Sequence, residues 1–506
     1  AKLGELVEFN PPAEVGDLPD STLVSFVPMR AVEEETGRID TSDIRTLGEV
    51  RKGYTSFKEG DLLFAKITPC MENGKIAIAP PLENGLGFGS TEFMVLRPYG
   101  HVEIRYLWCL LLQRSFRSEA EGMMRGGVGQ KRVPTSFMEG YELPLPPLKE
   151  QQRIVARIEE LSSGLDTAIT EARMTLGRLR EFRQAMLRNA FNGELTRSWR
   201  DEHPDIRETA HQLLDRILRS RRTRGTRDRL ARLGRRKKAE GLPPSKIREV
   251  LAKERSKIEA RYTDPDQPRS SDLPLIPDGW VWTTLETYAD VAGGVTVDRN
   301  RRMSKPCRVP YLRVANVQKG HIDLSDVKTI EVEADELPSI LLKKGDILLN
   351  EGGDRDKLGR GWVWCGELRE CTHQNHVFRA RPFISDFDPR FVSHYANEFG
   401  QGYFFERATQ TTNLASISKS RVSKLPIPLP HFDEHKIILA EIDRHMKAAD
   451  STEAEAVSCI ANAEKTRQAI LRDAFSGKLV RQDPRDEPAA TLLQESLAAR
   501  ARVNIE

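Results

Sequence analysis

The stretch QAMLRNAFNGEL at residues 184–195 returns as QAILRDAFSGKL at residues 468–479. Extending this match without a gap pairs residues 143–196 with residues 427–480 and gives 19 identities in 54 positions. The spacing between the copies is too long for a solenoid repeat. The chain therefore contains two large homologous halves, each with a Pro-Leu-Pro lead-in, a long helical pattern and an Ala-Phe-x-Gly ending.

The helical pattern of each copy predicts a coiled coil. In the first copy apolar residues alternate in steps of four and three, interrupted by Thr175: Ile154, Ile158, Leu161, Leu165, Ala168, Ala172, Leu179, Phe182 and Met186. About 40 helical residues make a rod of roughly 60 Å, and Gly193 is placed as its C-terminal stop. In the second copy one edge carries Ile442, Ala449, Ala456, Ala463 and Ile470, whose small members would let another helix approach closely.

The regions before the two helices predict mixed α+β domains. Short apolar runs bounded by Gly, Pro, Asn and Asp are typical of strands; they are VSFVPM (24–29), GDLLFAKI (60–67), KIAIA (75–79), EFMVLRP (92–98), YLRVANVQ (311–318), GDILLN (345–350) and HVFRARP (376–382). Helices are expected at 102–121 and near 390–407. A Gly-rich basic loop (123–137) follows the first, and TQTTNLASISKSRV (409–422) takes its place after the second.

Composition bounds the class of protein. With 39% hydrophobic and 7% aromatic residues the chain can form packed cores, so wholesale disorder is not expected. No apolar run approaches the length of a membrane span, so we expect a cytoplasmic protein. The six cysteines form no CxxC pair, as for reduced thiols. Cys365, Cys371, His373 and His376 could supply zinc ligands, but their spacing favours a strand and loop, so no metal is predicted.

The net charge of +3 conceals a basic segment. Residues 216–261 contain 18 Lys and Arg but five Asp and Glu, a net of +13, which leaves −10 for the rest. Two interpretations stay open. The segment is either a solvated helical insert or a patch for a phosphate backbone or an acidic partner.

Catalytic motifs are lacking. The sequence contains no Walker A loop, HExxH or GxSxG motif, and no carboxylate pair that indicates acid–base catalysis. Asn10-Pro11-Pro12-Ala13 is similar to the Asn-Pro-Pro-aromatic motif of amino-methyltransferases, but Ala13 stands where an aromatic residue would stack the target base. The glycines at 85, 87 and 89 do not form GxGxxG and are interpreted as turn residues.

The loops instead carry side chains suited to base edges and phosphates. Arg and Lys bind guanine, and Asn and Gln bind adenine. The DNA-contacting candidates are Lys66, Lys75, Arg125, Gln130, Lys131 and Arg132 in the first half, and Arg313, Asn316, Asn350, Arg355, Arg360, His373, Gln374, Asn375, Thr412, Asn413 and Lys419 in the second. Each alone is more often a plain surface residue; their concentration in loops supports the group.

Taken in order, these motifs resemble the specificity subunits of type I restriction–modification systems. The resemblance is carried by both Pro-Leu-Pro copies, the x-Glu-x-x-x-Ile-x-x-x-Ile helix starts (150–158 and 434–442), QA[MI]LR[ND]AF[NS]G[EK]L, YLRVANVQ, the two Gly-Asp-[LI]-Leu runs and HQNHVFRARP (373–382). It covers nearly the full length. The basic segment 216–261 departs from the family plan, being longer and more charged than a linker requires.

The resemblance implies an α+β fold with internal pseudo-twofold duplication. Two target-recognition domains would be joined by two long helices packed as an antiparallel coiled coil. The boundaries expected are 1–142 for recognition domain 1, 143–196 for helical region 1, 197–272 for the basic helical linker, 273–425 for recognition domain 2, 426–480 for helical region 2, and 481–506 for the C-terminal tail.

In that family each recognition domain reads one half of a split DNA site, the helices hold the domains apart, and two methyltransferase subunits dock on the helices and recruit nuclease–translocase subunits. The resemblance thus implies a non-catalytic chain that binds no cofactor, with S-adenosylmethionine, ATP and Mg²⁺ on its partners. Two recognition domains bound to one duplex would fit half-sites that lie about one turn of the DNA helix apart. Helix-interface or partner-docking roles are assigned to Ile154, Ile158, Leu161, Leu165, Leu179, Phe182, Met186, Phe191, Ile442, Ala449, Ile470 and Phe475.

Two other functions remain possible. The chain could be a self-contained methyltransferase or nuclease with an unrecognised site, which turnover by the purified protein would reveal. It could also be a coiled-coil scaffold without a DNA role, which salt-dependent binding to random duplex would contradict.

Overall fold

The computed structural model describes residues 1–503 except 13–14, 128, 297–302, 354–357 and 411–414. It divides into two compact units, one of residues 1–176 with 454–506 and one of residues 177–453. Each unit contains one globular head and parts of both long helices. Over the described residues, no helix has the length and apolar character needed to span a membrane.

The first head is built on two four-stranded sheets. One is antiparallel in the order β1-β8-β5-β6, and the other has the order β3-β2-β7-β4 with β2 and β7 parallel. Their bounds are β1 (Val7–Phe9), β2 (Leu23–Val27), β3 (Ile44–Thr46), β4 (Thr55–Lys58), β5 (Leu62–Ala65), β6 (Ile76–Ile78), β7 (Leu86–Gly89) and β8 (Phe93–Pro98). The four strand runs predicted in this half are confirmed.

Three helices of the first head, α2 (Ile104–Leu111), α3 (Arg114–Met123) and α4 (Thr135–Gly140), cover one face of the β1-β8-β5-β6 sheet. The short helix α1 (Leu47–Val50) packs instead against β2 and β7 of the other sheet. The single helix predicted at 102–121 was wrong, because the chain leaves the helical conformation at Gln113, which is extended and caps α3. The break lets Tyr106 and Phe116 both point into the core.

The second head repeats the central antiparallel sheet in the order β10-β19-β15-β17. Smaller sheets surround it: β14-β11-β18, β16-β21-β20, β22-β9 and β12-β13. The bounds are β9 (Val281–Thr284), β10 (Ala289–Ala292), β11 (Pro306–Leu312), β12 (Val317–Gln318), β13 (His321–Ile322), β14 (Lys328–Glu333), β15 (Ile347–Asn350), β16 (Gly352–Gly353), β17 (Gly361–Val363), β18 (Thr372–His373), β19 (Val377–Pro382), β20 (Thr409–Gln410), β21 (Ala415–Ser416) and β22 (Pro426–Leu429).

Two predictions in the second head need correction. The strand expected at 311–318 is split into β11 and β12 by a turn in which the Asn316 side chain accepts a hydrogen bond from the backbone N–H of Arg313. The helix expected near 390–407 is two helices, α11 (Pro389–Glu398) and α12 (Gly400–Arg407). The remaining short helices are α9 (Leu285–Tyr288), α10 (Leu337–Ile340) and α13 (Lys419–Ser423).

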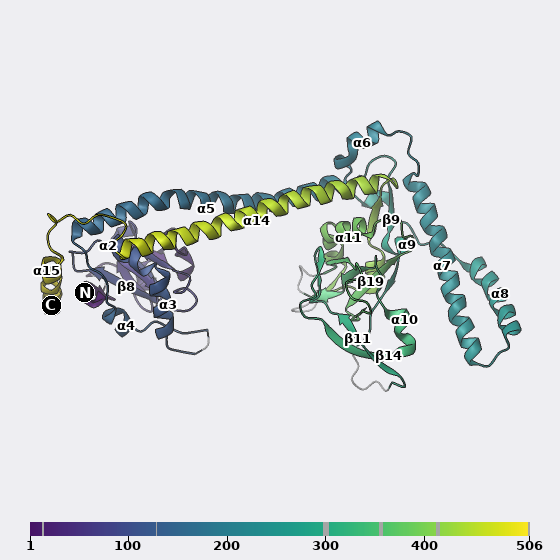
Figure 1. The fold of residues 1–506 in the computed structure, drawn as a ribbon, viewed down its shortest axis with the longest axis horizontal. Coiled ribbons are helices and arrows are strands. Elements are labelled where there is room, and N and C mark those ends of the chain that lie inside the picture. Colours follow the sequence, from purple (N-terminus) through teal and green to yellow (C-terminus); the bar gives the residue numbers. More distant parts are fainter. Residues whose placement is uncertain (13–14, 128, 297–302, 354–357, 411–414, 504–506) are drawn as a thin grey trace. The chain divides into compact units, whose positions relative to one another are not determined.

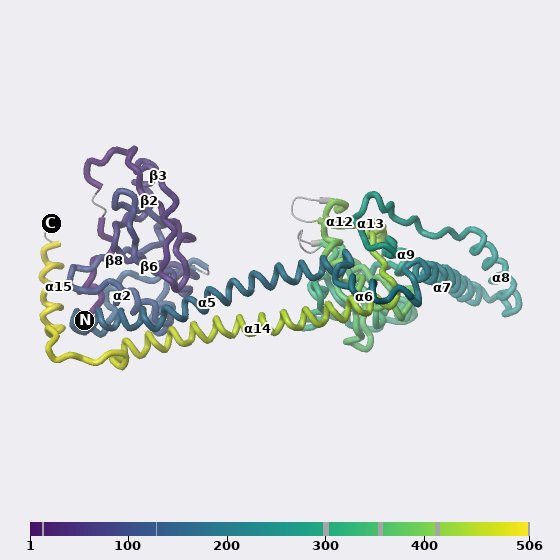
Figure 2. The backbone as a smooth tube through the Cα atoms, turned by 90° about the horizontal axis from the view of Figure 1, so that it is seen from above, coloured from purple at the N-terminus to yellow at the C-terminus, as the bar shows by residue number. Residues whose placement is uncertain are grey.

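The two long helices are α5 (Leu148–Phe191) and α14 (Glu434–Phe475), and Figures 1 and 2 show them side by side. In the first unit Asp166 of α5 pairs with Arg467 of α14. In the second unit Arg183 of α5 pairs with Asp450 and Glu453 of α14, each at 2.6 Å. The early part of one helix thus meets the late part of the other, which confirms the antiparallel pairing. Gly193, at φ +78°, ends the first helical region as predicted.

Most of the predicted interface residues lie inward. Ile154, Ile158, Met186, Phe191, Ile442 and Ala449 are buried, and Leu161, Leu165, Leu179, Ile470 and Phe475 are half-buried. The small row on α14 is also confirmed, since Ala456 and Ala463 are buried.

Phe182 lies at the margin of the helix pair, because its side chain is 43% exposed and makes an edge-on ring contact with His445 of α14. The inward neighbour is Arg183, whose ion pairs to α14 replace an apolar contact at that level. Ile169, rather than Ala168, is likewise the buried residue of its turn.

The segment after α5 is helical. It consists of α6 (Arg197–Glu202), α7 (Ala210–Ala239) and α8 (Pro244–Arg261), of which α7 and α8 form an antiparallel pair beside the second head (Figure 1). A final helix, α15 (Ala489–Val503), packs Leu492 into the core of the first head.

Candidate nucleic-acid interface

A short hairpin leaves the first head between α3 and α4. Its rung is the pair Arg125–Arg132, whose backbone N–H and C=O groups exchange hydrogen bonds of 3.0 and 2.9 Å. Gly126 has φ +133°, and a Cβ there would lie 2.5 Å from the carbonyl oxygen of Gln130. Only glycine fits this backbone, which explains the Gly-rich sequence. Gln130 and Lys131 stand exposed on the hairpin.

The hairpin is fastened to the central sheet. Arg132 forms a bridge to Ile67, two residues beyond β5, and its guanidinium donates hydrogen bonds of 2.7 and 2.8 Å to the carboxylate of Glu92. This contact lowers the pKa of Glu92. The backbone carbonyl of Lys66 accepts a bond from Val133 at 2.9 Å. Lys66, Gln130 and Lys131 therefore share one edge of the head.

The second head has an equivalent hairpin. After α12, strands β20 and β21 form a hairpin, and β21 pairs with β16, which begins two residues beyond β15. Ser416 of this hairpin pairs with Gly352, as Arg132 pairs with Ile67 in the first head. The two hairpins occupy equivalent places in the two halves, although their sequences differ.

Other predicted side chains gather around the second hairpin. The backbone N–H of Ile417 donates to the carbonyl of Glu351, and the N–H of Glu351 donates to that of His376, both at 2.9 Å. Gln374 and Asn375, half-buried, directly precede His376, and Lys419 is exposed at the start of α13. Gln374, Asn375 and Lys419 are thus held close to the second hairpin by backbone bonds.

Three predicted DNA-contacting residues are buried, and the structure corrects their assignment. The Asn316 amide donates to the carbonyls of Asp323 and Asp326, and the Asn350 amide donates to that of Val317, all within 2.9–3.0 Å. His373 donates from Nδ1 to the Val377 carbonyl at 2.7 Å, and burial lowers its pKa to about 4. These groups hold loops together and present no free edge to a duplex.

The remaining predicted residues are less well placed or lie outside the described structure. Lys75 donates from Nζ to the Met29 carbonyl at 3.2 Å, on a different loop from the hairpin. Arg313 pairs with Asp326 at 2.7 Å, and the Nε of Arg360 is buried without a hydrogen-bond partner among the described residues. Arg355, Thr412 and Asn413 fall in the segments 354–357 and 411–414, outside the described residues.

Sequence reasoning missed two acidic residues that fix the loops. Glu92 binds Arg132, and Glu351 binds the ring of His376 with an Nδ1–Oε2 distance of 2.6 Å. The sequence could have identified both residues, since Glu92 directly precedes the strand β8 and Glu351 directly follows GDILLN. A carboxylate at a strand end beside a basic loop indicates a positioning role.

The Cys–His cluster weighed for zinc is part of the second head's core. Cys371 is buried, which raises the pKa of its thiol to about 12, and His373 bonds the backbone. In the portion of the chain that the structure describes, no group of three or more His, Cys, Asp or Glu side chains is arranged to hold a metal ion.

Known proteins are similar to this chain. A family model described as the type I restriction modification DNA specificity domain matches residues 24–173. The EcoAI and EcoEI specificity subunits of type I restriction enzymes from Escherichia coli are each 27% identical to this chain. The matches cover 94% of this chain and 81% of each relative. A chain from a solved structure on complex assembly and conformational transition of the type I R-M system is 19% identical. It superposes with a TM-score of 0.53 over 94% of this chain and 97% of that one, which shows a common fold.

This chain is similar over most of its length to specificity subunits of type I restriction–modification systems, and residues 24–173 match their DNA specificity domain. The relatives are named as specificity subunits, which supports a non-catalytic specificity subunit over the alternative of a self-contained methyltransferase or nuclease.

Proposed function

We propose that each head reads one half of a bipartite duplex DNA site, using its hairpin and the loop ends beside it. The observation that carries this proposal is the pair of equivalent hairpins, alike in backbone placement and different in side chains. Phosphate contacts position a protein, whereas base contacts specify sequence. Two heads that share a scaffold and differ at the hairpins can therefore bind in the same manner and select different bases.

The paired helices α5 and α14 serve as the spacer in this proposal and dock two methyltransferase subunits, which recruit endonuclease and translocase subunits. S-adenosylmethionine, ATP and Mg²⁺ belong to those partners, and the complex works in the cytoplasm. Support comes from the duplication of the helices, because two similar surfaces suit two copies of one partner.

Substitutions on and beside the hairpins test the reading role. The chain is co-expressed with its methyltransferase subunit, and methylated sites are mapped across the host DNA. The double change Gln130→Ala with Lys131→Ala is expected to relax one half-site, and Lys419→Ala to relax the other. Equal loss at both half-sites in either variant would instead indicate contacts to the phosphate backbone.

A paired deletion tests the spacer role. One heptad is removed from each helix, residues 165–171 of α5 and residues 461–467 of α14. Ile470 then follows Ala456 by seven residues, so the spacing of the apolar row is kept. Both members of the Asp166–Arg467 ion pair are removed together. The mapped sites are expected to keep both half-sites with a shorter spacer. An unchanged spacer would contradict the proposal. Turnover by the purified chain alone with DNA, Mg²⁺ and labelled S-adenosylmethionine would favour the enzyme alternative.

A further inference from the structure

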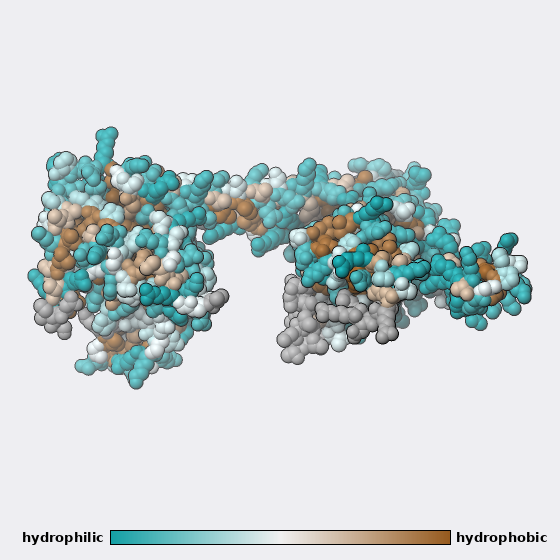
Figure 3. All heavy atoms as spheres, turned by 60° about the horizontal axis from the view of Figure 1, so that its bottom comes forward, coloured by the Kyte–Doolittle hydropathy of each residue, from teal (hydrophilic) through white to brown (hydrophobic). Residues whose placement is uncertain are grey.

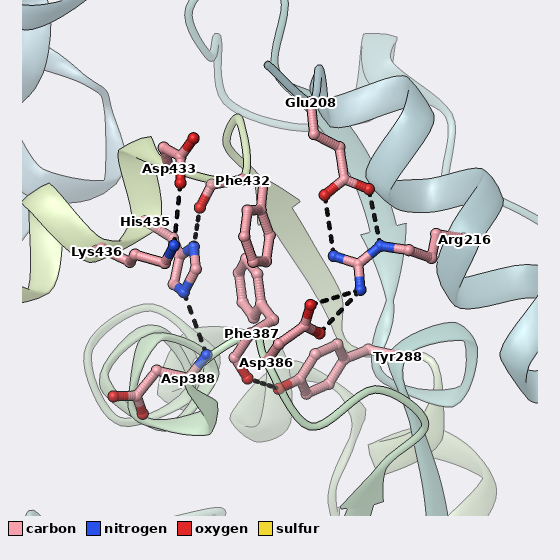
Figure 4. A network of polar contacts seen from close by, with 10 residues as sticks. All are labelled: Glu208, Arg216, Tyr288, Asp386, Phe387, Asp388, Phe432, Asp433, His435 and Lys436. Atoms are coloured by element: carbon pink, nitrogen blue, oxygen red, sulfur yellow. Dashed lines mark hydrogen bonds and ion pairs between the residues drawn. The ribbon is translucent and has the colours of Figure 1, made fainter. Parts of the chain in front are cut away.

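The basic segment begins as a helix tightly fixed to the second head. On α7, Leu213 and Ile217 are fully buried. Arg216 between them binds the Glu208 carboxylate at 2.7 and 3.0 Å and both Asp386 oxygens at 2.8 Å (Figure 4). Arg224 donates to the Pro382 carbonyl at 2.9 Å. The start of α7 is thus a rigid part of this head.

The segment that returns from α8 to the head is fixed as well. Tyr262, directly after α8, accepts a hydrogen bond of 2.8 Å from Arg221, and the guanidinium of Arg222 lies 5.3 Å from its ring centroid. Gln267 bonds Thr283 of β9 at 2.8 Å. Both ends of the helical hairpin formed by residues 224–261, called the basic arm below, are therefore clamped to the second head.

Covering the head does not require the basic arm. The α7 stretch TAHQLLDRIL (209–218) matches PAATLLQESL (488–497) of α15, which packs on the first head. Leu213 corresponds to the buried Leu492. Arg216 corresponds to Glu495, which pairs with His101 of the first head at 3.0 Å. The contacts of α7 with the head thus lie in its first half and extend to Arg224, and the rest of the basic arm serves another purpose.

The charges of the basic arm are largely unbalanced. Eight exposed cations have no ion-pair partner among the residues that the structure describes: Arg232, Arg235, Lys238, Lys246, Arg248, Lys253, Arg255 and Lys257. Figure 3 shows a predominantly hydrophilic surface at this end of the second unit. Like charges crowded on two helices destabilise them, and a polyanionic ligand would relieve that repulsion.

A groove between the helices is lined by Arg229, Arg232, Leu233, Arg236 and Lys237 of α7 and by Val250 and Glu254 of α8. Arg232 belongs to the eight unpaired cations, whereas Arg229, Arg236 and Lys237 pair with Glu254 or Glu240. Residues 224–261 contain no Asn, Gln or aromatic side chain. The arm therefore lacks the amide groups that pair with adenine and the rings that stack on bases, and its exposed Lys and Arg side chains suit phosphates.

We propose that the basic arm binds the phosphate backbone of duplex DNA next to the half-site read by the second head, without reading sequence. This inference rests on the proposed function, since it places the same duplex against the same head. Removing one cation that binds a phosphate should reduce the salt dependence of binding, so that log Kd changes by about 0.9 less per log unit of salt.

The test uses the full chain and a labelled duplex of random sequence, titrated at several salt concentrations. The arm variant is R232Q/R235Q/K253Q/K257Q. A matched control removes four exposed helical cations from α5 and α14, R178Q/R180Q/K447Q/K465Q. The arm variant is expected to lower the salt slope by roughly 2–4 and to weaken binding at least about tenfold near 0.1 M salt, with the control close to the parent. Thermal unfolding should be unchanged or raised, because repulsion is removed.

An arm variant that binds random duplex with the parent's affinity and slope would overturn the inference and leave an acidic protein partner as the occupant of the arm. Equal losses in arm and control variants would also overturn it, since they would reflect net charge alone. A changed base preference at the second half-site would contradict sequence-independent contact.

The outcomes separate this inference from the proposed function. If the arm variant binds random DNA normally while the parent directs methylation to a bipartite site, the arm inference alone fails. If the salt slope falls as expected but no sequence preference is found for the parent, the reading role fails and the arm stands.

Discussion

The carboxylate of Asp346 accepts two hydrogen bonds from the guanidinium of Arg381, each 2.6 Å long, deep inside the second head. Asp61 and Arg97 form the same bidentate pair in the first head at 2.8 and 2.7 Å. In both heads the aspartate also accepts the backbone N–H three residues before it, from Lys343 and Lys58. The two heads have diverged at their hairpins while keeping this clamp between a turn and the adjacent central strand.

Breaking the clamp should destabilise its head. Asp346→Ala leaves a buried guanidinium without its counterion, which costs about 3–5 kcal/mol. Asp346→Asn keeps part of the hydrogen bonding and should cost less. Urea denaturation measures both. The control is Asp433→Ala, whose pair with Lys436 (Figure 4) is partly exposed and contributes at most about 1 kcal/mol. Equal losses in Asp346→Ala and Asp433→Ala would show that the buried pair is not a clamp.

Two apolar residues of the long helices should differ sharply in their contribution to stability. Ile442 is fully buried against the second head, so Ile442→Ala is expected to cost about 2–5 kcal/mol. Phe182 is 43% exposed, so Phe182→Ala should cost about 1 kcal/mol or less. Denaturation midpoints of the two variants give the comparison. If Phe182→Ala lost more stability than Ile442→Ala, Phe182 would be a core residue of the helix pair, as the heptad pattern predicts.

The second head should lose stability in mild acid. The backbone N–H of Asp388 donates to Nε2 of His435 at 3.2 Å, so the folded ring is neutral there (Figure 4). Burial lowers the pKa of His435 from the ordinary value of 6.5 to about 4. Below pH 6.5 the unfolded chain binds a proton that the folded chain does not, so the free energy of unfolding falls as the pH drops from 6.5 toward 4.

Replacing the histidine should flatten that pH dependence. The melting temperature of His435→Gln, measured between about pH 7.5 and 4.5, is expected to change less with pH than that of the parent. His321→Gln serves as the control, because His321 is exposed on β13. The same slope in parent and His435→Gln would place the titrating group elsewhere, with the buried His373 and the half-buried His394 as the next candidates, since burial lowers the pKa of each to about 4.

Among the predicted DNA-contacting residues, substitution of a buried residue should reduce stability, whereas substitution of an exposed residue should weaken DNA binding. Asn350→Ala removes donors to the Val314 and Val317 carbonyls and is expected to destabilise the chain by about 1–3 kcal/mol. Lys131→Ala should leave the free energy of unfolding within about 0.5 kcal/mol of the parent while weakening binding to duplex DNA. If Asn350→Ala left the free energy of unfolding unchanged but altered the half-site that is recognised, Asn350 would contact DNA after all.

Periodicity alone predicted the parts of the fold whose stability is local. The long helices begin and end where their heptads, Glu434 and Gly193 indicate, because helix termination depends on a few neighbouring residues. The strands GDLLF and GDILLN were recognisable because a buried strand must be a short apolar run. The duplication in the sequence identified which segments of the two halves are equivalent.

The tertiary structure decided what the polar residues do. Asn316, Asn350 and His373 have the chemistry of base-reading residues, yet the fold satisfies their hydrogen bonds internally. Arg183, which the heptad pattern does not place at the interface, lies there because its ion pairs to Asp450 and Glu453 compensate its charge. Whether a polar group faces solvent or a backbone carbonyl depends on contacts between residues distant in sequence, and only the folded chain brings those residues together.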